Sequence, residues 1–210
     1  ALPPITTCSL IWFLIMPSAL MGFSRSAAEM VPADFSEAPT ARARLPVPAD
    51  LAAQGMALRP EAEDDLPFLR RLYVSTRWEE LRPAPWSDEQ KLAFLSSQFQ
   101  MQRLHYTTHY LGREFLVIER QGEPIGRLYL DRGSEHDLRV VDIAFLPEHR
   151  GKGYGTALLG AALQEAAAGG KVASIHVEEF NPARRLYDRL GFRPVSTQGP
   201  YCRMEKPPAG

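Results

Sequence analysis

The stretch from Val140 to Thr156 constrains the fold more than any other part of this 210-residue chain. It begins with the apolar run Val140 to Leu146, whose β-branched residues suit a buried strand. Pro147 ends that run, and Arg150-Gly-Lys-Gly-Tyr-Gly155 then leads into a segment rich in alanine and leucine. The sequence therefore predicts a strand, a glycine-rich turn and a helix in direct succession.

The glycine-rich turn has the properties of an anion site. Gly151, Gly153 and Gly155 carry no Cβ, so the backbone can approach a bulky ligand closely. The unpaired N–H groups of the first helical turn point at the same place, at the positive end of the helix dipole. Arg150 and Lys152 add positive charge, and no carboxylate follows before Glu165, so we expect an external anion here.

Two common nucleotide-binding patterns do not fit this turn. A P-loop requires Gly-x4-Gly-Lys-Ser/Thr, which the chain does not contain. The dinucleotide fingerprint Gly-x-Gly-x-x-Gly also fails, because Thr156 stands where the third glycine is required after Gly151 and Gly153. Binding of ATP or a dinucleotide at this turn is therefore not indicated.

A second motif follows in the order that one known family requires. The run Arg150 to Gly155 has the pattern Arg-x-x-Gly-x-Gly, and Asn181-Pro-Ala-Arg-Arg-Leu-Tyr187-Asp-Arg-Leu-Gly191-Phe192 comes after it. Together they resemble the two signatures of the GNAT superfamily of acyl-CoA-dependent N-acyltransferases. The resemblance covers roughly Met56 to Lys206, and its motifs lie between Val140 and Phe192.

The resemblance implies a mixed α+β fold, with a central, mostly antiparallel sheet of six to seven strands flanked by about four helices. Hydrophobic periodicity and turn residues place the elements independently of the family. Strands are predicted at 56–60, 114–120, 124–131, 138–146, 172–177, 192–195 and 201–204. A first helix is predicted after an acidic cap at 61–65, with Leu66, Leu69, Leu72 and Tyr73 on one face. Further helices are predicted at 88–109, 152–168 and 182–190, the last with Asn181 as N-cap and Pro182 at its first position.

The same resemblance assigns a binding site for acetyl-CoA as co-substrate, without a metal. It implies that the diphosphate lies on Gly151, Lys152, Gly153, Tyr154, Gly155 and Thr156, beside Arg150. Backbone groups of Ile143, Ala144 and Phe145 would hold the pantetheine arm where their strand leaves its neighbour. Asn181 is similar to the family's CoA-contacting asparagine, although a helix cap explains an asparagine equally well.

Three residues are candidates for the chemistry of acyl transfer. Tyr187 resembles the tyrosine near the thioester sulfur, where it would hydrogen-bond or protonate the departing thiolate. Asp142, on the strand entering the site, and His176, on the next strand, are candidate bases. A reaction without a base remains an alternative, because some amines enter partly neutral.

The acceptor is expected under the two N-terminal helices and the loop between them. Candidate contacts are Tyr73, Trp78, Glu79, Trp86 and Gln102, with Glu79 able to attract a cation. The resulting hypothesis is N-acetyl transfer to a primary amine of a small molecule or peptide, by direct attack in a ternary complex. A non-catalytic acyl-CoA sensor on the same fold is the rival, and a nucleotide-dependent oxidoreductase or kinase is a third option.

Composition narrows the range of partners. The formal net charge of −1 and the pI near 6.6 argue against a nucleic-acid-binding protein. Cys8 and Cys202 lie far apart in unlike contexts, so neither a disulfide framework nor a zinc site is indicated and a cytoplasmic location fits. A homodimer is left open by the sequence.

The N-terminal segment differs from the rest of the chain. Residues 1–24 contain no charged side chain, and Pro32, Pro39, Pro46 and Pro48 punctuate the following stretch. We therefore divide the chain into a hydrophobic segment with a Pro/Ala-rich linker, 1–54, and an acyltransferase domain, 55–207. Three interpretations of the hydrophobic part stay open: an extension upstream of a natural start at Met21 or Met30, an arm that packs on the domain or a partner, and a membrane segment, which its polar residues disfavour.

Overall fold

The computed structural model describes residues 43–110 and 112–208, which lie within the compact unit Pro39–Gly210. The hydrophobic segment predicted for residues 1–24 and the linker up to residue 42 lie outside the described residues.

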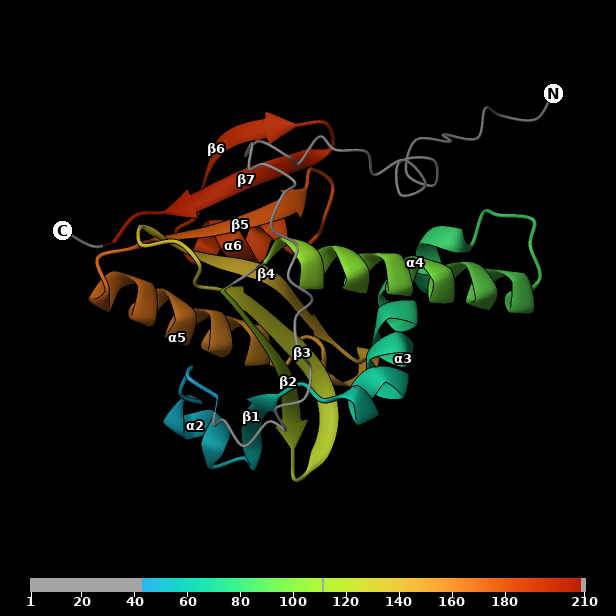
Figure 1. Ribbon diagram of the computed structural model, residues 1–210, viewed down its shortest axis with the longest axis horizontal. Helices are drawn as coiled ribbons and strands as arrows, with labels where there is room; N and C mark the ends of the chain where they lie inside the picture. Colours follow the sequence, from blue (N-terminus) through green and yellow to red (C-terminus); the bar gives the residue numbers. More distant parts are fainter. Residues whose placement is uncertain (1–42, 111, 209–210) are drawn as a thin grey trace, which may run out of the picture. The chain divides into compact units, whose positions relative to one another are not determined.

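A seven-stranded sheet is the centre of the described unit (Figure 1). Its strands are β1 (Met56–Pro60), β2 (Arg113–Arg120), β3 (Glu123–Asp131), β4 (Asp137–Phe145), β5 (Val172–Glu178), β6 (Arg193–Gln198) and β7 (Tyr201–Lys206). They are ordered β1-β2-β3-β4-β5-β7-β6, and every neighbouring pair is antiparallel except the parallel pair β4 and β5. The predicted fold class is therefore confirmed.

Helices cover both faces of this sheet (Figure 1). The α-helices are α2 (Ala49–Ala52), α3 (Leu66–Arg77), α4 (Asp88–His109), α5 (Tyr154–Ala168) and α6 (Arg184–Arg189). Short 3-10 turns lie at η1 (Glu63–Asp65), η2 (Trp78–Leu81) and η3 (Pro147–His149). Because successive side chains of a strand point to opposite faces, β3 directs Leu128 and Leu130 toward α5, and Arg127 and Tyr129 toward α4.

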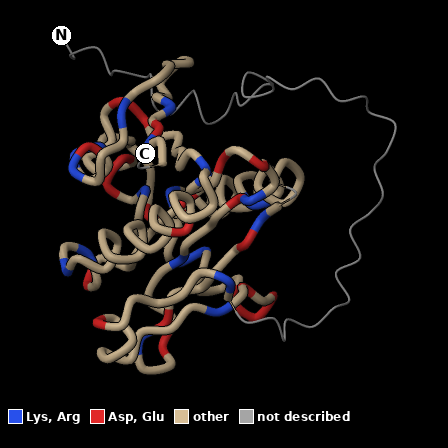
Figure 2. The backbone as a smooth tube through the Cα atoms, turned by 90° about the vertical axis from the view of Figure 1, so that its left-hand side faces the viewer, with Lys and Arg blue, Asp and Glu red and all other residues tan. Residues whose placement is uncertain are grey.

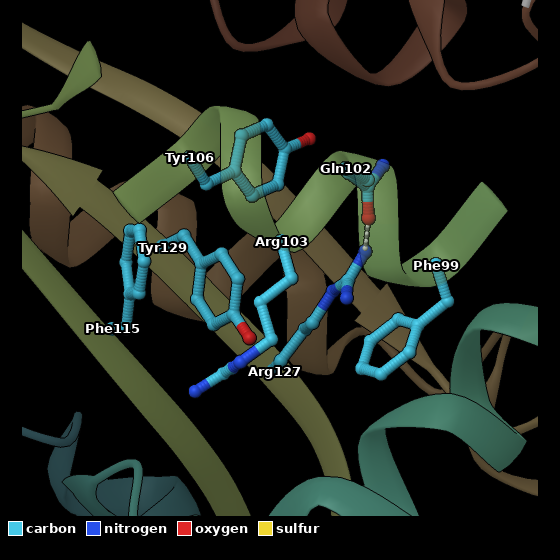
Figure 3. A pocket seen from close by; sticks show the side chains of 7 residues that line it. All are labelled: Phe99, Gln102, Arg103, Tyr106, Phe115, Arg127 and Tyr129. Carbon is cyan, nitrogen blue, oxygen red and sulfur yellow. Dashed lines mark hydrogen bonds between the residues drawn. The ribbon is translucent and has the colours of Figure 1, made fainter. Parts of the chain in front are cut away.

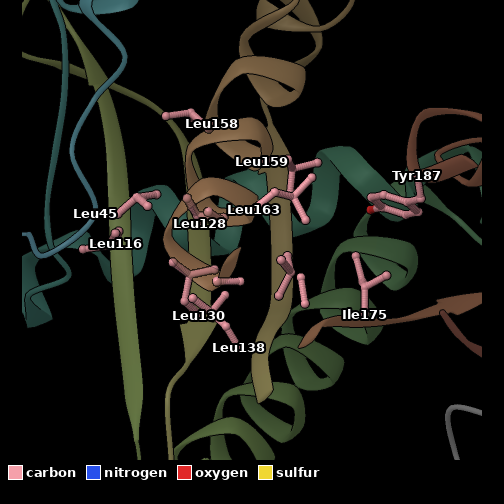
Figure 4. Close-up of a cluster of buried hydrophobic side chains, with 14 of the residues drawn as sticks. Leu45, Leu116, Leu128, Leu130, Leu138, Leu158, Leu159, Leu163, Ile175 and Tyr187 are labelled. Atoms are coloured by element: carbon pink, nitrogen blue, oxygen red, sulfur yellow. The ribbon is translucent and has the colours of Figure 1, made fainter. Parts of the chain in front are cut away.

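The larger core lies between the sheet and α5 (Figure 4). Alternate residues of β2, β3, β4 and β5 meet the apolar face of α5, and each side chain removed from water in this way contributes about 1.5–3 kcal/mol. Fully buried leucines of this cluster are Leu116, Leu128, Leu130, Leu138, Leu158 and Leu159. This packing fixes the position of α5, and with it the turn at its N-terminus.

The ends of the elements follow from local chemistry. Ser87 and Gln90 form a reciprocal capping box that starts α4 at Asp88, as predicted. Gln121 and Gly122 both have positive φ, as the two-residue turn of the β2–β3 hairpin requires.

Two helix starts differ from the prediction. Helix α5 begins at Tyr154 instead of Lys152, because Gly151 and Gly153 have φ of 72° and 82° and cannot continue a right-handed helix backwards. Helix α6 begins at Arg184, with Ala183 as N-cap, so Pro182 is not its first residue. Asn181 instead closes the preceding turn, since its Oδ1 accepts a hydrogen bond from the Ala183 N–H at 2.9 Å.

Residues 43–54 belong to the segment that the sequence predicts as a linker, yet they contribute to the core. Leu45 and Leu51 are 1% and 3% exposed and pack in the same cluster as Met56 of β1. Packing against the sheet therefore starts about ten residues before the predicted domain boundary at residue 55.

The described surface carries both signs of charge, and Figure 2 shows Lys and Arg interspersed with Asp and Glu. Cys202 is a buried free thiol, whereas Cys8 lies outside the described residues. Within residues 43–110 and 112–208, no helix combines the length and the apolar character needed to cross a bilayer.

Candidate functional site

The parallel strands β4 and β5 part in the middle of the sheet. They pair at only four positions, from Asp137↔Val172 to Val140↔Ile175, although β4 continues to Phe145 and β5 to Glu178. Beyond this point β4 stays with β3, up to the pair Gly126↔Phe145, and β5 stays with β7. The backbone groups of Val141–Phe145 that point toward β5 therefore have no strand partner on that side.

A bulge and a glycine accompany the separation. Tyr129 pairs with Asp142 and Leu130 with Val140, so Val141 is an extra residue in β4 and bends it. A Cβ on Gly126 would lie 2.5 Å from the Ala144 carbonyl oxygen, so only glycine allows β4 to follow β3 this closely. The separation of β4 from β5 is thus supported by Gly126 in β3 and by Val141 in β4 itself.

The turn after β4 presents its main chain to solvent. Gly151 and Gly153 have left-handed φ, and a Cβ on either residue would meet no heavy atom within 4 Å. Gly155 has ordinary helical backbone, and its missing Cβ leaves room beside the Phe145 ring. The first two glycines are therefore required by backbone conformation, and they border open space.

The backbone N–H groups of this turn are not used by the protein. Among the described residues, no hydrogen bond is donated by the N–H of any residue from 151 to 156, and the first such bond is from Ala157 to the Gly153 carbonyl at 3.1 Å. The first turn of α5 contains no acidic residue and no side-chain cap. An anion could therefore accept several hydrogen bonds here at the positive end of the helix.

The two cations of the turn have different roles. Arg150 donates to the Phe145 carbonyl at 2.8 Å and to the carbonyl and hydroxyl of Ser75 at 3.3 and 3.2 Å. It therefore holds the turn against β4 and the last turn of α3. Lys152 is exposed and has no ion pair within the described chain, so it can reach a ligand.

The last turn of α3 also contacts the other side of the separation. Arg77 hydrogen-bonds Glu178, at the end of β5, at 3.3 Å, and Glu80, in η2, at 2.9 Å. Helix α3 thus touches the end of β4 through Arg150 and the end of β5 through Arg77. These contacts fix the two edges of the gap relative to each other.

Tyr187 lies on α6 and is 5% exposed, in edge contact with Phe192 at 5.9 Å. Figure 4 shows it beside Ile175, at the last paired position of β5. Burial raises the pKa of Tyr187 above the ordinary value of a phenol, and the charge of Asp142 raises it further. The phenol is therefore protonated over the physiological pH range.

A buried ion pair at the centre of the sheet was not predicted from the sequence. Arg127 of β3 pairs with Asp142 of β4, and its Nη2 also donates to Gln102 of α4 at 2.9 Å. Burial raises the pKa values of five tyrosines, and the charge of Asp142 raises them further: Tyr73, Tyr106, Tyr110, Tyr129 and Tyr187. The charge of Arg127 opposes the increase in Tyr73, Tyr106 and Tyr129. An arginine between Gly126 and Leu128 in an otherwise apolar strand was the available signal.

A small pocket adjoins this ion pair between α4 and strands β2 and β3 (Figure 3). It is lined by Phe99, Gln102, Arg103, Tyr106, Phe115, Arg127 and Tyr129. The Arg127 guanidinium lies over the Tyr129 ring, 5.1 Å from its centroid. Arg127 therefore both lines the pocket and pairs with Asp142, which is not among the lining residues.

His176 lies in surroundings that disfavour a proton. It is half-buried on β5, opposite Arg203 of β7. Burial lowers the pKa of His176 to about 4, and the positive charges of Arg139 and Arg203 contribute to the decrease. The imidazole is therefore neutral at pH 7 and a weak proton acceptor.

The predicted acceptor residues are only partly brought together. Tyr73 is 2% exposed against Phe99, and burial raises its pKa to about 12. Gln102 contacts the Arg127–Asp142 pair through its hydrogen bond to Arg127, and the charges of the pair act on the Tyr73 phenol. Glu79 is paired with Arg82 at the surface, and Trp86 packs on Phe94, so neither is joined to that pair by a contact. Trp78 is half-buried in η2.

Side chains that could bind a metal ion do not cluster in the described residues. Nowhere in residues 43–110 and 112–208 do three His, Cys, Asp or Glu side chains gather in a way that could hold a metal ion.

Known structures share this architecture. PaiA N-acetyltransferase from Thermoplasma acidophilum, solved with coenzyme A, is 20% identical with a TM-score of 0.55, and the alignment covers 72% of this chain and 98% of that one. Spermidine N-acetyltransferase from Vibrio cholerae, solved with CoA and spermine, is 22% identical with a TM-score of 0.51, covering 73% and 95%. An acetyltransferase from Thermus thermophilus is 23% identical with a TM-score of 0.51, covering 72% and 96%. At these identities the likeness establishes the fold.

Sequence comparison establishes the family. No curated protein matches the sequence significantly. The profile of the acetyltransferase (GNAT) family matches residues 72–192, more than half of the chain, and this range contains the gap between β4 and β5, the glycine turn and Tyr187. The protein is therefore a member of the GNAT family of acetyltransferases.

Proposed function

We propose that the protein transfers the acetyl group of acetyl-CoA to a primary amine of a small molecule or peptide, with both substrates bound at the same time. Acetyl-CoA would bind along the gap between β4 and β5, and the amine would approach from the side of α3 and α4. The proposal also includes a cytoplasmic location, and it leaves the homodimer open.

One observation carries this proposal: the unused N–H groups of residues 151–156 adjoin the unpaired edge of β4. A diphosphate needs several converging donors, and a pantetheine arm, which contains two amides, needs an extended backbone edge to hydrogen-bond. Coenzyme A requires both features in this order. The open space at Gly151 and Gly153 supports the same ligand, because a Cβ at either position would fill the cradle.

The roles of the site residues follow from where they lie. Main-chain groups of Ile143, Ala144 and Phe145 would bind the arm, and those of residues 151–156 the diphosphate, with Lys152 adding charge. Attack of the amine forms a C–N bond and breaks the C–S bond, so negative charge develops on sulfur. Tyr187 is protonated and would donate a hydrogen bond to that sulfur.

We do not assign His176 as the base that removes a proton from the amine. A base with a pKa of about 4, such as His176, accepts a proton from an ammonium only against a large free-energy difference. Asp142 is held by Arg127 and is proposed as a hydrogen-bond acceptor for the amine. We therefore propose that the amine enters in its neutral form.

Substitution of a glycine in the turn tests the diphosphate site. Gly153→Glu places a carboxylate against the unused N–H groups and should raise the Kd for acetyl-CoA about 100-fold or more, measured by calorimetry. Gly170→Glu is the matched control, because Gly170 also has positive φ and an open Cβ position but follows the other end of α5. Equal loss of affinity in both variants, or stabilisation of the wild-type protein by NAD or ATP more than by acetyl-CoA, would contradict the site.

Removal of one hydroxyl tests the role of Tyr187. Tyr187→Phe should lower kcat for acetylation of an amine at least tenfold, because about 1.5–3 kcal/mol of hydrogen bonding to a charged group is lost in the transition state. The Kd for acetyl-CoA and the unfolding temperature should stay close to the wild-type values. A wild-type kcat in this variant would remove Tyr187 from the reaction, and binding without turnover of any amine by the wild-type protein would favour the acyl-CoA sensor.

The pH dependence of stability tests the surroundings of His176. Because its folded pKa of about 4 is below the ordinary 6.5, the unfolded chain binds the extra proton first as the pH falls through this window. The stability that neutral His176 contributes is thus complete above pH 6.5 and is lost toward pH 4. Between pH 7.5 and 5.0, His176→Gln should lose fewer degrees of unfolding temperature than the wild type, with exposed His136→Gln as control. The assignment would be contradicted if His176→Gln and the wild type lost equal amounts of unfolding temperature between these pH values. Abolished acetylation by His176→Gln at neutral pH would contradict it as well.

A further inference from the structure

Arg127 is a charged side chain in a place where charge is costly. It lies in the middle of β3, between Val117 of β2 and Ala144 of β4, and is 3% exposed. Removing a guanidinium from water costs several kcal/mol even when it is paired, and replacing a buried ion pair by apolar residues is often neutral or stabilising. Stability alone therefore does not explain an arginine at this position.

The hydrogen bonds of the Arg127 guanidinium come from one of its nitrogens. Its Nη2 donates to one carboxylate oxygen of Asp142 and to the Gln102 amide oxygen, whereas its Nε is buried without a hydrogen-bond partner among the described residues. Gln102 and the Tyr129 ring, visible in Figure 3, restrict the guanidinium further. Arg127 thus holds Asp142 in one orientation although its own buried Nε–H group has no hydrogen-bond partner among the described residues.

Asp142 lies at the boundary between the core and the gap. Its side chain is 18% exposed, directly after the bulge at Val141 and on the part of β4 that no longer pairs with β5. Arg127 occupies Oδ2, and no side chain or N–H of the described chain hydrogen-bonds Oδ1. One oxygen is thus fixed, and the other is left for a ligand.

Resting on the proposed acetyl transfer, we propose that Arg127 is a positioning residue for the acceptor. By holding Oδ2, it aims Oδ1 of Asp142 at an N–H of the attacking amine, so that the nitrogen lone pair points at the thioester carbon. The nitrogen then forms the C–N bond and loses one proton, while the C–S bond breaks and the sulfur gains one. The groups that interact electrostatically with Asp142 are Arg127 and Tyr129 of β3, Tyr73 of α3, Tyr106 of α4, Tyr110 directly after α4, and Tyr187 of α6.

A double-mutant cycle in the full chain separates positioning from stability. Arg127→Met should lower both the unfolding temperature and kcat/KM for the amine, the latter about 100-fold, because the nucleophile is misplaced. Asp142→Asn should lower kcat/KM similarly, and its near-identical shape keeps the test available if Arg127→Met does not fold. The double variant Arg127→Met/Asp142→Asn should regain unfolding temperature but not kcat/KM. Affinity for acetyl-CoA should stay within about twofold throughout.

Arg132 offers a matched control. It also pairs with carboxylates, those of Glu114 and Glu165, but it lies directly after the C-terminal end of β3. Arg132→Met should lower the unfolding temperature. At assay temperatures below that of unfolding, its kcat/KM for the amine should equal the wild-type value. Recovery of kcat/KM together with stability in the double variant would overturn the inference, since the pair would then serve only the fold. Absence of acetylation of any amine by the wild-type protein would instead contradict the proposed function itself.

Discussion

The separation of two parallel strands is the constraint on which the rest of this structure depends. Strands β4 and β5 share only four paired positions, after which each continues with its other neighbour. Gly126 allows β4 to stay close to β3, the extra residue Val141 bends it, and α3 contacts both edges through Arg150 and Arg77. An open backbone edge inside a sheet normally attracts another strand. Here it leads directly to the unused N–H groups at the start of α5.

Much of this arrangement could be predicted from local sequence. The apolar run ending at Leu146, the glycines after it and the helix that follows are each specified by neighbouring residues, so their order was recognisable and is confirmed. The start of α5 was misplaced because two glycines of left-handed φ delay the helix until Tyr154. The start of α6 was misplaced because Asn181 closes a turn and not the helix itself.

Features that depend on distant parts of the chain were not predictable in this way. Leu45 and Leu51 lie among prolines and alanines, and only the sheet to which they pack makes them core residues. The partner of Arg127 is set by the register of β3 and β4, which periodicity does not specify. Likewise, the low pKa of His176 arises from burial and from Arg139 and Arg203 on adjacent strands, so a residue that suggested a base proves poorly suited to be one. The positions of Trp86 and Glu79, which have no contact with the ion pair, were also not predictable from neighbouring residues.

The polar interior of this protein divides into two parts with different tasks. Main-chain groups at the end of β4 and the start of α5 present donors without side chains, which suits an anion common to many reactions. Side chains at Arg127 form the second part, in which the guanidinium pairs with Asp142, hydrogen-bonds Gln102 and lies over the Tyr129 ring. In the proposed reaction the first part would bind the acyl donor and the second the acceptor, so we expect changes in acceptor preference to arise in the second.

Hydrogen exchange at the backbone amides of residues 151–156 tests the central claim most directly. These amides make no hydrogen bond within the described protein, so they should exchange quickly in the free protein. Adding coenzyme A should slow their exchange at least about tenfold, with smaller protection along 141–145, while the amides at the other end of α5 stay unchanged. Unchanged exchange at residues 151–156 under saturating coenzyme A, or protection confined to another part of the chain, would contradict the account.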